Sequence, residues 1–218
     1  MVYVTGDMHG DYDRFKARAL RRLRRGDTLI ICGDFGFVWD GGKAEQRLLK
    51  KLGRKRYTIA FLDGVHENHG LLAGYNTVDW NGGRARQISG RLYQLLRGQV
   101  YTIEGNTVFT LGGGENPDAD CWSEALEGCM PTAGELEQAE RNLAAADYRV
   151  DYVVTHECTG VVKSFLNMDS NMYNQLYAFL NCAAQTVRCK RWFFGCQHID
   201  KVIPPKYVGV YKEVRKLE

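Results

Sequence analysis

Several short turns in this chain carry the residue types that bind metal ions. The first is Gly6-Asp7-Met8-His9-Gly10, which directly follows the apolar run Val2 to Val4. A carboxylate and an imidazole two residues apart at the end of a strand can point into one pocket and bind one ion. Further turns of this kind are Gly33-Asp34, Gly64-Val65-His66-Glu67-Asn68, Thr155-His156-Glu157 and Gly195-Cys196-Gln197-His198.

These turns share one structural position, because each follows an apolar run that reads as a β-strand. In open α/β sheets, ligands bind in the crevice outside the carboxyl ends of the strands. Taken singly, such an Asp is most often a turn residue and such a His a hydrogen-bonded core or surface group. However, four of the five histidines lie in these turns and only His69 does not. The ordered set therefore predicts one metal site assembled from several strands.

The mixture of carboxylates and imidazoles indicates the chemistry of this site. It suits Mn²⁺, Fe or Zn²⁺ better than Ca²⁺, which prefers oxygen ligands, or a structural zinc, which prefers thiolates. Such ions polarise a phosphoryl oxygen and lower the pKa of bound water, so that hydroxide is available at neutral pH for in-line attack on phosphorus. The sequence therefore predicts hydrolysis of phosphate mono- or diesters by metal-bound hydroxide.

From Asp7 to His198 the series of motifs resembles the calcineurin-like metallophosphoesterases. Their pattern is Asp-x-His, Gly-Asp, Gly-Asn-His-Asp/Glu, a single His, and Gly-His-x-His. The resemblance implies that a first divalent metal is held by Asp7, His9, Asp34 and His198. It also implies that Asp34 bridges to a second metal held by His156. His66 would contact the scissile phosphate and protonate the leaving oxygen as a general acid, which makes His66 and Asp34 the expected catalytic residues.

Two residues depart from the family pattern. Val65 stands where the family has Asn, and its side chain offers no donor atom. Cys196 stands where the family has the first His of Gly-His-x-His. Its thiolate would be a soft metal ligand favouring Zn²⁺, or it is an inert buried thiol, and the sequence leaves both readings open. The first metal site is thus complete and the second is weakened, so one or two ions are expected.

Two further residues are candidates for supporting roles. Glu67 follows the predicted general acid and would orient it, or is an exposed loop acid. Arg97 would bind phosphate through its planar fork of donors, or is a solvated surface group. The segment Gly113 to Gly128 reads as a long surface loop that would close over the substrate, with Trp122 offering a stacking surface.

The segment Arg14 to Arg25 contains seven basic residues and no acid. It would steer nucleic acid or another anionic substrate, or it is a solvated helix face whose charge suits the C-terminal end of the helix dipole. We therefore expect a phosphorylated small molecule or nucleotide as substrate and keep nucleic acid open as a partner. The alternatives are a nuclease or nucleotide phosphodiesterase, and a catalytically impaired descendant that only binds phosphate or nucleic acid.

The elements that must position these residues alternate between strand and helix in the first part of the chain. Strands are predicted at 2–5, 28–32 and 57–63, with helices at 11–25 and 43–53. This alternation favours parallel pairing under covering helices. A hairpin at 99–111, with the three-residue turn 104–106, predicts a second and partly antiparallel sheet. Further strands are expected at 151–155, 191–195 and 207–211, and helices at 131–146, with a capping box at Thr132 and Glu135, and 172–183.

We therefore expect an α/β fold, a metallophosphoesterase-like sandwich of two mixed β-sheets flanked by helices, forming a single domain over residues 1–218. The net charge of +3, with 29 basic and 26 acidic residues, does not demand a nucleic-acid partner. An odd count of seven cysteines, with Cys32, Cys158 and Cys182 in apolar runs, favours reduced buried thiols and a cytoplasmic location. No apolar stretch is long enough to span a membrane, and the oligomeric state stays undetermined.

Overall fold

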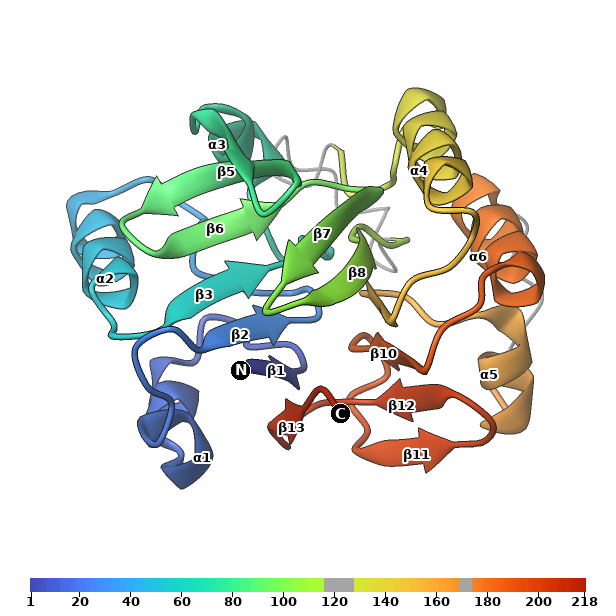
Figure 1. Cartoon of the computed structure of the whole chain (residues 1–218). Helices are drawn as coiled ribbons and strands as arrows, with labels where there is room; N and C mark the ends of the chain where they lie inside the picture. The colour runs from blue at the N-terminus through green and yellow to red at the C-terminus, as the bar shows by residue number, and fades with distance from the viewer. Residues whose placement is uncertain (116–127, 169–173) are drawn as a thin grey trace.

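A computed structural model describes residues 1–115, 128–168 and 174–218 of the chain. Two β-sheets face each other and helices cover their outer faces (Figure 1). The first sheet has the order β13-β1-β2-β3-β6-β5-β4, and the second has the order β11-β12-β10-β9-β8-β7. The predicted sandwich of two mixed sheets is therefore confirmed.

The strand bounds follow the chain order. The strands of the first sheet are β1 Val2–Thr5, β2 Thr28–Ile31, β3 Thr58–Phe61, β4 Thr77–Trp80, β5 Gly83–Ser89, β6 Leu92–Leu95 and β13 Arg215–Lys216. Those of the second are β7 Gln99–Ile103, β8 Asn106–Leu111, β9 Tyr152–Thr155, β10 Arg191–Phe194, β11 Lys201–Ile203 and β12 Tyr207–Gly209. The pairs β1–β2 and β2–β3 are parallel, as the alternation of elements in the first part of the chain predicted, and β8–β9 and β9–β10 are parallel as well.

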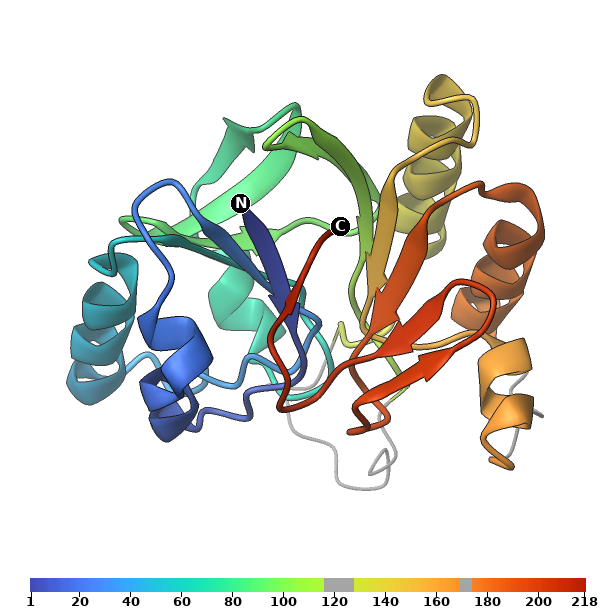
Figure 2. The same cartoon turned by 60° about the horizontal axis from the view of Figure 1, so that its bottom comes forward.

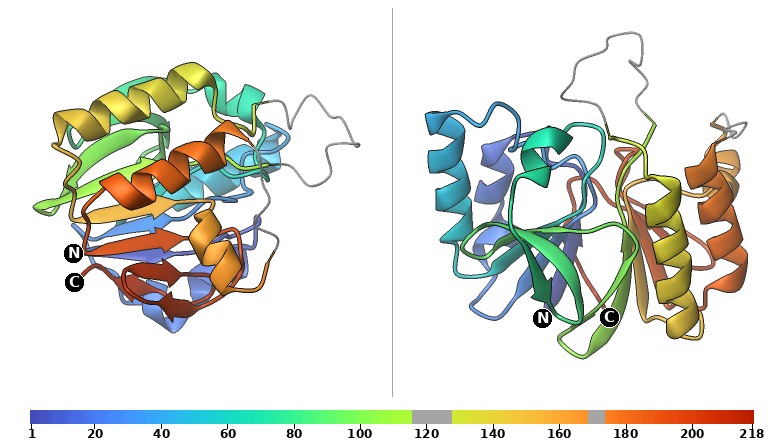
Figure 3. Two further views of the ribbon diagram at one scale, coloured as in Figure 1. Left: turned by 90° about the vertical axis from the view of Figure 1, so that its right-hand side faces the viewer. Right: turned by 90° about the horizontal axis from the view of Figure 1, so that it is seen from above.

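Three apolar clusters hold together the layers of sheets and helices that Figure 2 and Figure 3 show. One lies between the sheets and includes Val4, Ile30 and Val154. A second packs the outer face of the first sheet against α1 Arg18–Arg21, α2 Lys43–Gly53 and α3 His69–Ala73. The third packs the second sheet against α4 Ala133–Ala145, α5 Gly160–Phe165 and α6 Gln175–Thr186.

The basic segment does not form the single helix that its sequence predicted. A 3₁₀ helix spans Tyr12–Lys16, Ala17 has an extended ψ of 140°, and α1 covers only four residues. The break at Ala17 lies between the buried Phe15 of the 3₁₀ helix and the buried Leu20 of α1. With helices this short, the dipole explanation for the order of charges falls away.

Local sequence signals were reliable at α2 and α4. The predicted bounds of α2 match, and the capping box of Thr132 and Glu135 is present. The hairpin of β7 and β8 is also present, but Ile103 pairs with Asn106, so its turn has two residues rather than three. Helix α6 starts at Gln175, and the start predicted at 172 lies outside the described residues.

The sequence predicted buried cysteines and no membrane-spanning segment. Cys32 and Cys158 are buried as expected, whereas Cys182 is exposed on α6, so its burial was predicted wrongly. No helix in the described ranges has the length and apolar character needed to cross a membrane.

Candidate metal centre

The predicted site residues meet where strands of both sheets end. Asp7 and His9 follow β1, Asp34 follows β2, His156 follows β9 and His198 follows β10. Backbone hydrogen bonds fix the turns to each other: the N–H groups of Met8 and His9 donate to the Asp34 carbonyl at 2.9 and 2.8 Å. The Gly195 N–H likewise donates to the His156 carbonyl at 3.1 Å.

Asp7, His9 and His198 form the first group of candidate metal ligands. The two imidazole Nε2 atoms lie 2.9 Å apart, and Nε2 of His198 lies 3.0 Å from Oδ2 of Asp7. Two ligand atoms bound at about 2.1 Å and at right angles lie about 3 Å apart, so these separations suit one ion. Both carboxylate oxygens of Asp7 are buried, and the polar groups that face them are the rings of His198 at 3.0 Å and His156 at 3.8 Å. The donor set therefore fits a divalent metal.

Asp34 connects this group to a second one that also contains His9 and His66. Its Oδ2 lies 2.7 Å from Nδ1 of His66, and its Oδ1 accepts the N–H groups of Val65 and His66 at 2.7 and 2.9 Å. Burial alone would raise the pKa of Asp34, but His156 and the hydrogen bonds of His66 outweigh it and hold this pKa below its usual range. The hydrogen bond to Asp34 in turn raises the pKa of His66.

His156 is fully buried and aims one ring nitrogen at this carboxylate. Its Nδ1 lies 3.0 Å from the carbonyl oxygen of Cys32, and its Nε2 lies 3.6 Å from Oδ1 of Asp34. A backbone carbonyl on the second nitrogen is typical of metal-binding histidines, because it fixes the tautomer and the ring orientation. Burial lowers the pKa of His156, but the charges of Asp34 and Asp7 raise it to about 9.

Glycines make room for these ligands at the strand ends. A Cβ on Gly33 would lie 2.1 Å from Nδ1 of His156, and one on Gly195 would lie 2.2 Å from Oδ1 of Asp7. A Cβ on Gly64 would lie 2.1 Å from Oδ1 of Asp34. Each glycine thus leaves the space that a ligand from a neighbouring strand occupies.

Three of the candidate ligands have a backbone conformation that is rare outside glycine. The φ angles of His9, Asp34 and His198 are 47°, 43° and 49°. This left-handed conformation costs about 1 to 2 kcal/mol for most residues. Backbone strain of this kind is concentrated at functional sites, where the surrounding structure enforces it.

Comparison with known proteins now assigns the family. The model of the calcineurin-like phosphoesterases matches residues 1–160. The chain belongs to the calcineurin-like phosphoesterase family. A solved structure of a protein assigned as a 5'-nucleotidase from Staphylococcus aureus, in complex with α-ketoglutarate, has a similar fold, with a TM-score of 0.55 and 15% sequence identity. The alignment covers 98% of this chain but 49% of the other, so the chain spans about half the length of that protein. A search of the curated proteins finds no significant match.

The two departures from the calcineurin-like pattern are explained by their surroundings. Val65 contributes only its backbone N–H to Asp34. Its side chain lies near the His156 ring, since a Cβ added to Gly114 would lie 3.3 Å from Cγ1 of Val65 and 3.2 Å from Cδ2 of His156. Cys196 belongs to neither group of candidate ligands in the described part of the chain. Burial, then the neighbouring charge and hydrogen bond of Glu157, raise the pKa of its thiol well above the usual value, so the thiol is protonated at neutral pH.

A buried polar network, which the sequence did not indicate, lies behind Cys196. The Tyr177 hydroxyl donates to Oε2 of Glu157 at 2.6 Å, and the Lys163 ammonium donates to that hydroxyl. The ammonium also lies 3.8 Å from the carboxylate of Glu157. The Glu157 carboxylate beside Cys196 is therefore held by Tyr177 and by the ammonium of Lys163.

Glu67 supports the site in a different way from the one expected. It is fully buried rather than an exposed loop acid, and it bonds to backbone N–H groups, whereas Asp34 is the carboxylate that contacts the His66 ring. Its carboxylate accepts the N–H groups of Gly64 at 2.8 Å, of Gly36 at 3.3 Å and of Phe35. Burial, and then the charge of Asp34, raise the pKa of Glu67 to about 8. Glu67 therefore ties the turn after β2 to the turn after β3.

Arg97 is a structural cross-link, which contradicts the expectation that it binds substrate phosphate. Its guanidinium contacts Asp63 at 2.5 Å and Glu135 at 3.2 Å. The remaining donor contacts go to the carbonyls of residues 128, 129 and 130. The side chain is only 7% exposed, so its donors are already used inside the protein.

Arg14 and Tyr211 complete the surroundings of the first group of ligands, and no sequence signal distinguished them. The Arg14 guanidinium donates to the carbonyls of Asp7 and Tyr211. The Tyr211 ring stacks on His198, with centroids 4.7 Å apart. Trp122 and most of the predicted substrate loop lie outside the described residues.

Proposed function

We propose that this chain is a metal-dependent phosphoesterase that hydrolyses phosphate mono- or diesters. The observation that carries this proposal is the convergence of Asp7, His9 and His198 beside the hydrogen-bonded pair of Asp34 and His66. A fully buried carboxylate such as that of Asp7 is costly unless positive charge compensates it. Membership of the family supports the same activity.

The side chains have distinct roles in this proposal. Asp7, His9, Asp34 and His198 would hold the first ion. A bound Mn²⁺, Fe or Zn²⁺ would act as a Lewis acid on phosphate and supply hydroxide at neutral pH. His66 acts as the general acid, because its side chain is 56% exposed towards solvent and the hydrogen bond with Asp34 raises its pKa, which favours the protonated ring. Asp34 orients the His66 ring through the 2.7 Å contact at Nδ1.

We propose that the second ion binds weakly or not at all. His156 and Asp34 remain to hold it, but Val65 offers no donor side chain and the Cys196 thiol is directed to Glu157. Loss of a mere outer-shell partner typically reduces metal affinity or activity about 10 to 100-fold, so loss of two direct ligands costs at least as much.

The proposed substrate is a phosphorylated small molecule, with a nucleotide as the first class to test. The similar structure assigned as a 5'-nucleotidase supports this choice. A nuclease is the second candidate, favoured by the exposed basic side chains between Arg18 and Arg25.

The deciding experiment measures metal content and turnover together. We expect one transition ion per chain by native mass spectrometry, and hydrolysis of an aryl phosphate monoester or diester that a chelator abolishes. The double substitution Val65→Asn and Cys196→His should raise the stoichiometry towards two. A chain that binds no metal and stays inactive in excess Mn²⁺ would instead be a phosphate-binding descendant that has lost catalysis.

A further inference from the structure

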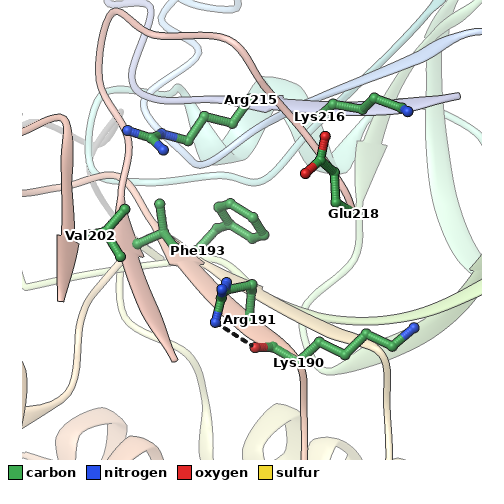
Figure 4. Close-up of a pocket in the computed structure, with 8 residues that line it drawn as sticks. Lys190, Arg191, Phe193, Val202, Arg215, Lys216 and Glu218 are labelled. Carbon is green, nitrogen blue, oxygen red and sulfur yellow. Dashed lines mark hydrogen bonds between the residues drawn. The ribbon is translucent and has the colours of Figure 1, made fainter. Parts of the chain in front are cut away.

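A cavity of about 520 Å³ lies between β13 and the strands β10, β11 and β12 (Figure 4). Its volume is within the range of roughly 300 to 1,000 Å³ that small-molecule sites occupy. It is separate from the metal centre, because its residue Arg191 begins β10 whereas His198 follows the other end of that strand. None of the residues that line the cavity belongs to the two groups of candidate metal ligands.

One wall of the cavity is apolar. Phe193 on β10 pairs with Val208 on β12, and Val208 pairs with Val202 on β11. Directly paired residues of neighbouring strands present their side chains on the same face of the sheet. The three side chains therefore form a continuous row, and Val202 at its outer end is 51% exposed. This row offers contact area to an apolar or aromatic part of a ligand.

The rest of the lining is strongly basic. It contains the basic side chains of Lys190, Arg191, Arg215 and Lys216 and the single acid Glu218. This excess of positive charge is as large as the net charge of +3 carried by the whole chain. Such a concentration of like charge in one cavity raises the local concentration of anions.

Part of this charge is not compensated within the protein. Lys190 pairs with Asp151 at 2.8 Å, and Arg215 pairs with Glu213. Arg191 and Lys216 pair with no acidic side chain in the described ranges, and Arg191 contacts only backbone carbonyls at 3.4 Å. In addition, Nε of Arg215 is buried without a hydrogen-bond partner in the part of the chain described. Arg191 and Lys216 are thus uncompensated, and Arg215 keeps one donor that its ion pair with Glu213 does not use.

We propose that this cavity binds a phosphorylated organic molecule of nucleotide size, at a site separate from the metal centre. Arg191, Arg215 and Lys216 would hold the phosphate groups through charge-assisted hydrogen bonds. The row of Phe193, Val208 and Val202 would contact the apolar part. The Glu218 carboxylate points into the cavity, where it accepts a hydrogen bond from a hydroxyl or amino group of the ligand (Figure 4). An anion without an apolar part would contact the basic side chains but not the row of Phe193, Val208 and Val202.

The test uses the full chain and adenosine diphosphate as the probe, with a chelator present so that the metal centre does not contribute. Binding is measured by calorimetry and located by amide chemical shifts in NMR spectra. The variant carries Arg191→Gln and Lys216→Gln. The matched control carries Arg47→Gln and Lys50→Gln, which remove one arginine and one lysine from exposed positions of α2.

We expect the probe to bind the wild type and the control equally and the cavity variant about tenfold more weakly or worse, since charge-assisted hydrogen bonds are among the strongest. Shifts should be centred on Phe193, Val202 and Val208. Inorganic phosphate and adenosine alone should each bind more weakly than the complete probe. A second variant, Val202→Glu, changes an exposed wall position and should weaken binding as well.

Several results would overturn the proposal. Equal affinity of the cavity variant and the control would show that these cations do not hold the probe. Shifts confined to the turns of Asp7 and His198 would place binding at the metal centre alone. The organic ligand would likewise be excluded if adenosine diphosphate showed no saturable binding. It would also be excluded if inorganic phosphate bound with the same affinity as adenosine diphosphate. None of these outcomes affects turnover of an aryl phosphate, so the proposed hydrolase activity is judged independently.

Discussion

Asp34 is the residue on which most contacts of the site converge. One of its oxygens accepts two backbone N–H groups from the turn after β3, and the other contacts the His66 ring. The backbone carbonyl of Asp34 also accepts two N–H groups from the turn after β1. Its lowered pKa keeps it ionised at neutral pH. One side chain thus orients the proposed general acid and would share in metal binding.

Replacement of the proposed general acid tests its role directly. We expect His66→Ala to lower kcat by about 10²- to 10⁴-fold, the usual contribution of general acid catalysis, with metal content unchanged. The loss should be largest for alkyl phosphates, whose leaving oxygens need the proton most, and smallest for nitrophenyl phosphates. Turnover of both classes at the wild-type rate would refute the assignment. Measurement of kcat across a series of leaving groups distinguishes these outcomes.

Arg97 offers a prediction about stability rather than catalysis. Burial would raise the pKa of Asp63, but the charge of Arg97 outweighs it and holds this pKa below its usual value. A folded-state pKa below the unfolded value stabilises the protein above the unfolded pKa, and that stability is lost as the pH falls through the folded value. Arg97→Met removes the partner and should cost about 3 to 5 kcal/mol at pH 7, because a buried charge is left unpaired.

Urea unfolding at pH 7 and near pH 3.5 measures this effect. The difference from wild type should shrink at the lower pH, where Asp63 becomes protonated in the variant. Combining Arg97→Met with Asp63→Asn should recover part of the loss at pH 7. A destabilisation independent of pH and of residue 63 would mean that the carbonyl contacts, not the ion pair, explain the role of Arg97.

The sequence identified the candidate ligands better than the residues around them. Asp7, His9 and Asp34 were recognisable because their types and local spacing alone indicate metal binding. The partners of Glu67 and Arg97 lie about 30 residues away along the chain, so only the folded sheet brings these groups together. Both side chains are buried and link segments of the protein, whereas the sequence had predicted roles for them beside the substrate or at the surface.

At the scale of elements, the glycines after β2, β3 and β10 set how closely neighbouring turns approach. Gly195→Ala would bring a Cβ within 2.2 Å of Oδ1 of Asp7 and 2.4 Å of the Cys32 carbonyl, so one of these must shift. We expect metal affinity to fall about 10 to 100-fold or more, as for loss of ligand orientation. Calorimetric titration with Mn²⁺ or Zn²⁺ provides the measurement.

The matched control is Gly134→Ala on α4, where an added Cβ meets nothing within 4 Å. It should leave metal affinity unchanged and raise stability by up to about 1 kcal/mol, the helix propensity difference between the two residues. Equal effects of the two substitutions on metal binding would argue against the packing role of Gly195.

Helices and strands with strong local sequence signals were predicted correctly, whereas those without such signals were missed. The helix α4 has a capping box and the hairpin of β7 and β8 has a glycine in its turn, and both were found. The sheet edge formed by β4, β5 and β6 was missed. The run 83–89 contains two arginines and few apolar residues, and its strand forms because it pairs with both neighbours. Such tertiary pairing outweighs intrinsic strand propensity.

For the whole molecule, the position of the site between the two sheets matters. Asp7 and Asp34 belong to strands of the first sheet, whereas His156 and His198 follow strands of the second. A bound ion would therefore connect the sheets, and its binding energy adds to the free energy of unfolding. At a free metal concentration a hundred times the dissociation constant, the gain is about 2.7 kcal/mol.

Thermal unfolding with and without a chelator tests this connection. We expect the chelator to lower the Tm of the wild type and to have no effect on His9→Ala, in which the first site has lost a ligand. If the chelator lowered both Tm values equally, the stabilising ion would be bound elsewhere.

The left-handed backbone of His9, Asp34 and His198 has a consequence for the evolution of this fold. Glycine adopts such φ angles readily, so a change of His198 to glycine would remove metal binding while relaxing the backbone. Selection for stability alone would favour that exchange. These three side chains therefore carry a cost in folding stability that metal binding would justify. A descendant that no longer needs catalysis is expected to lose its metal-binding side chains first at these three positions.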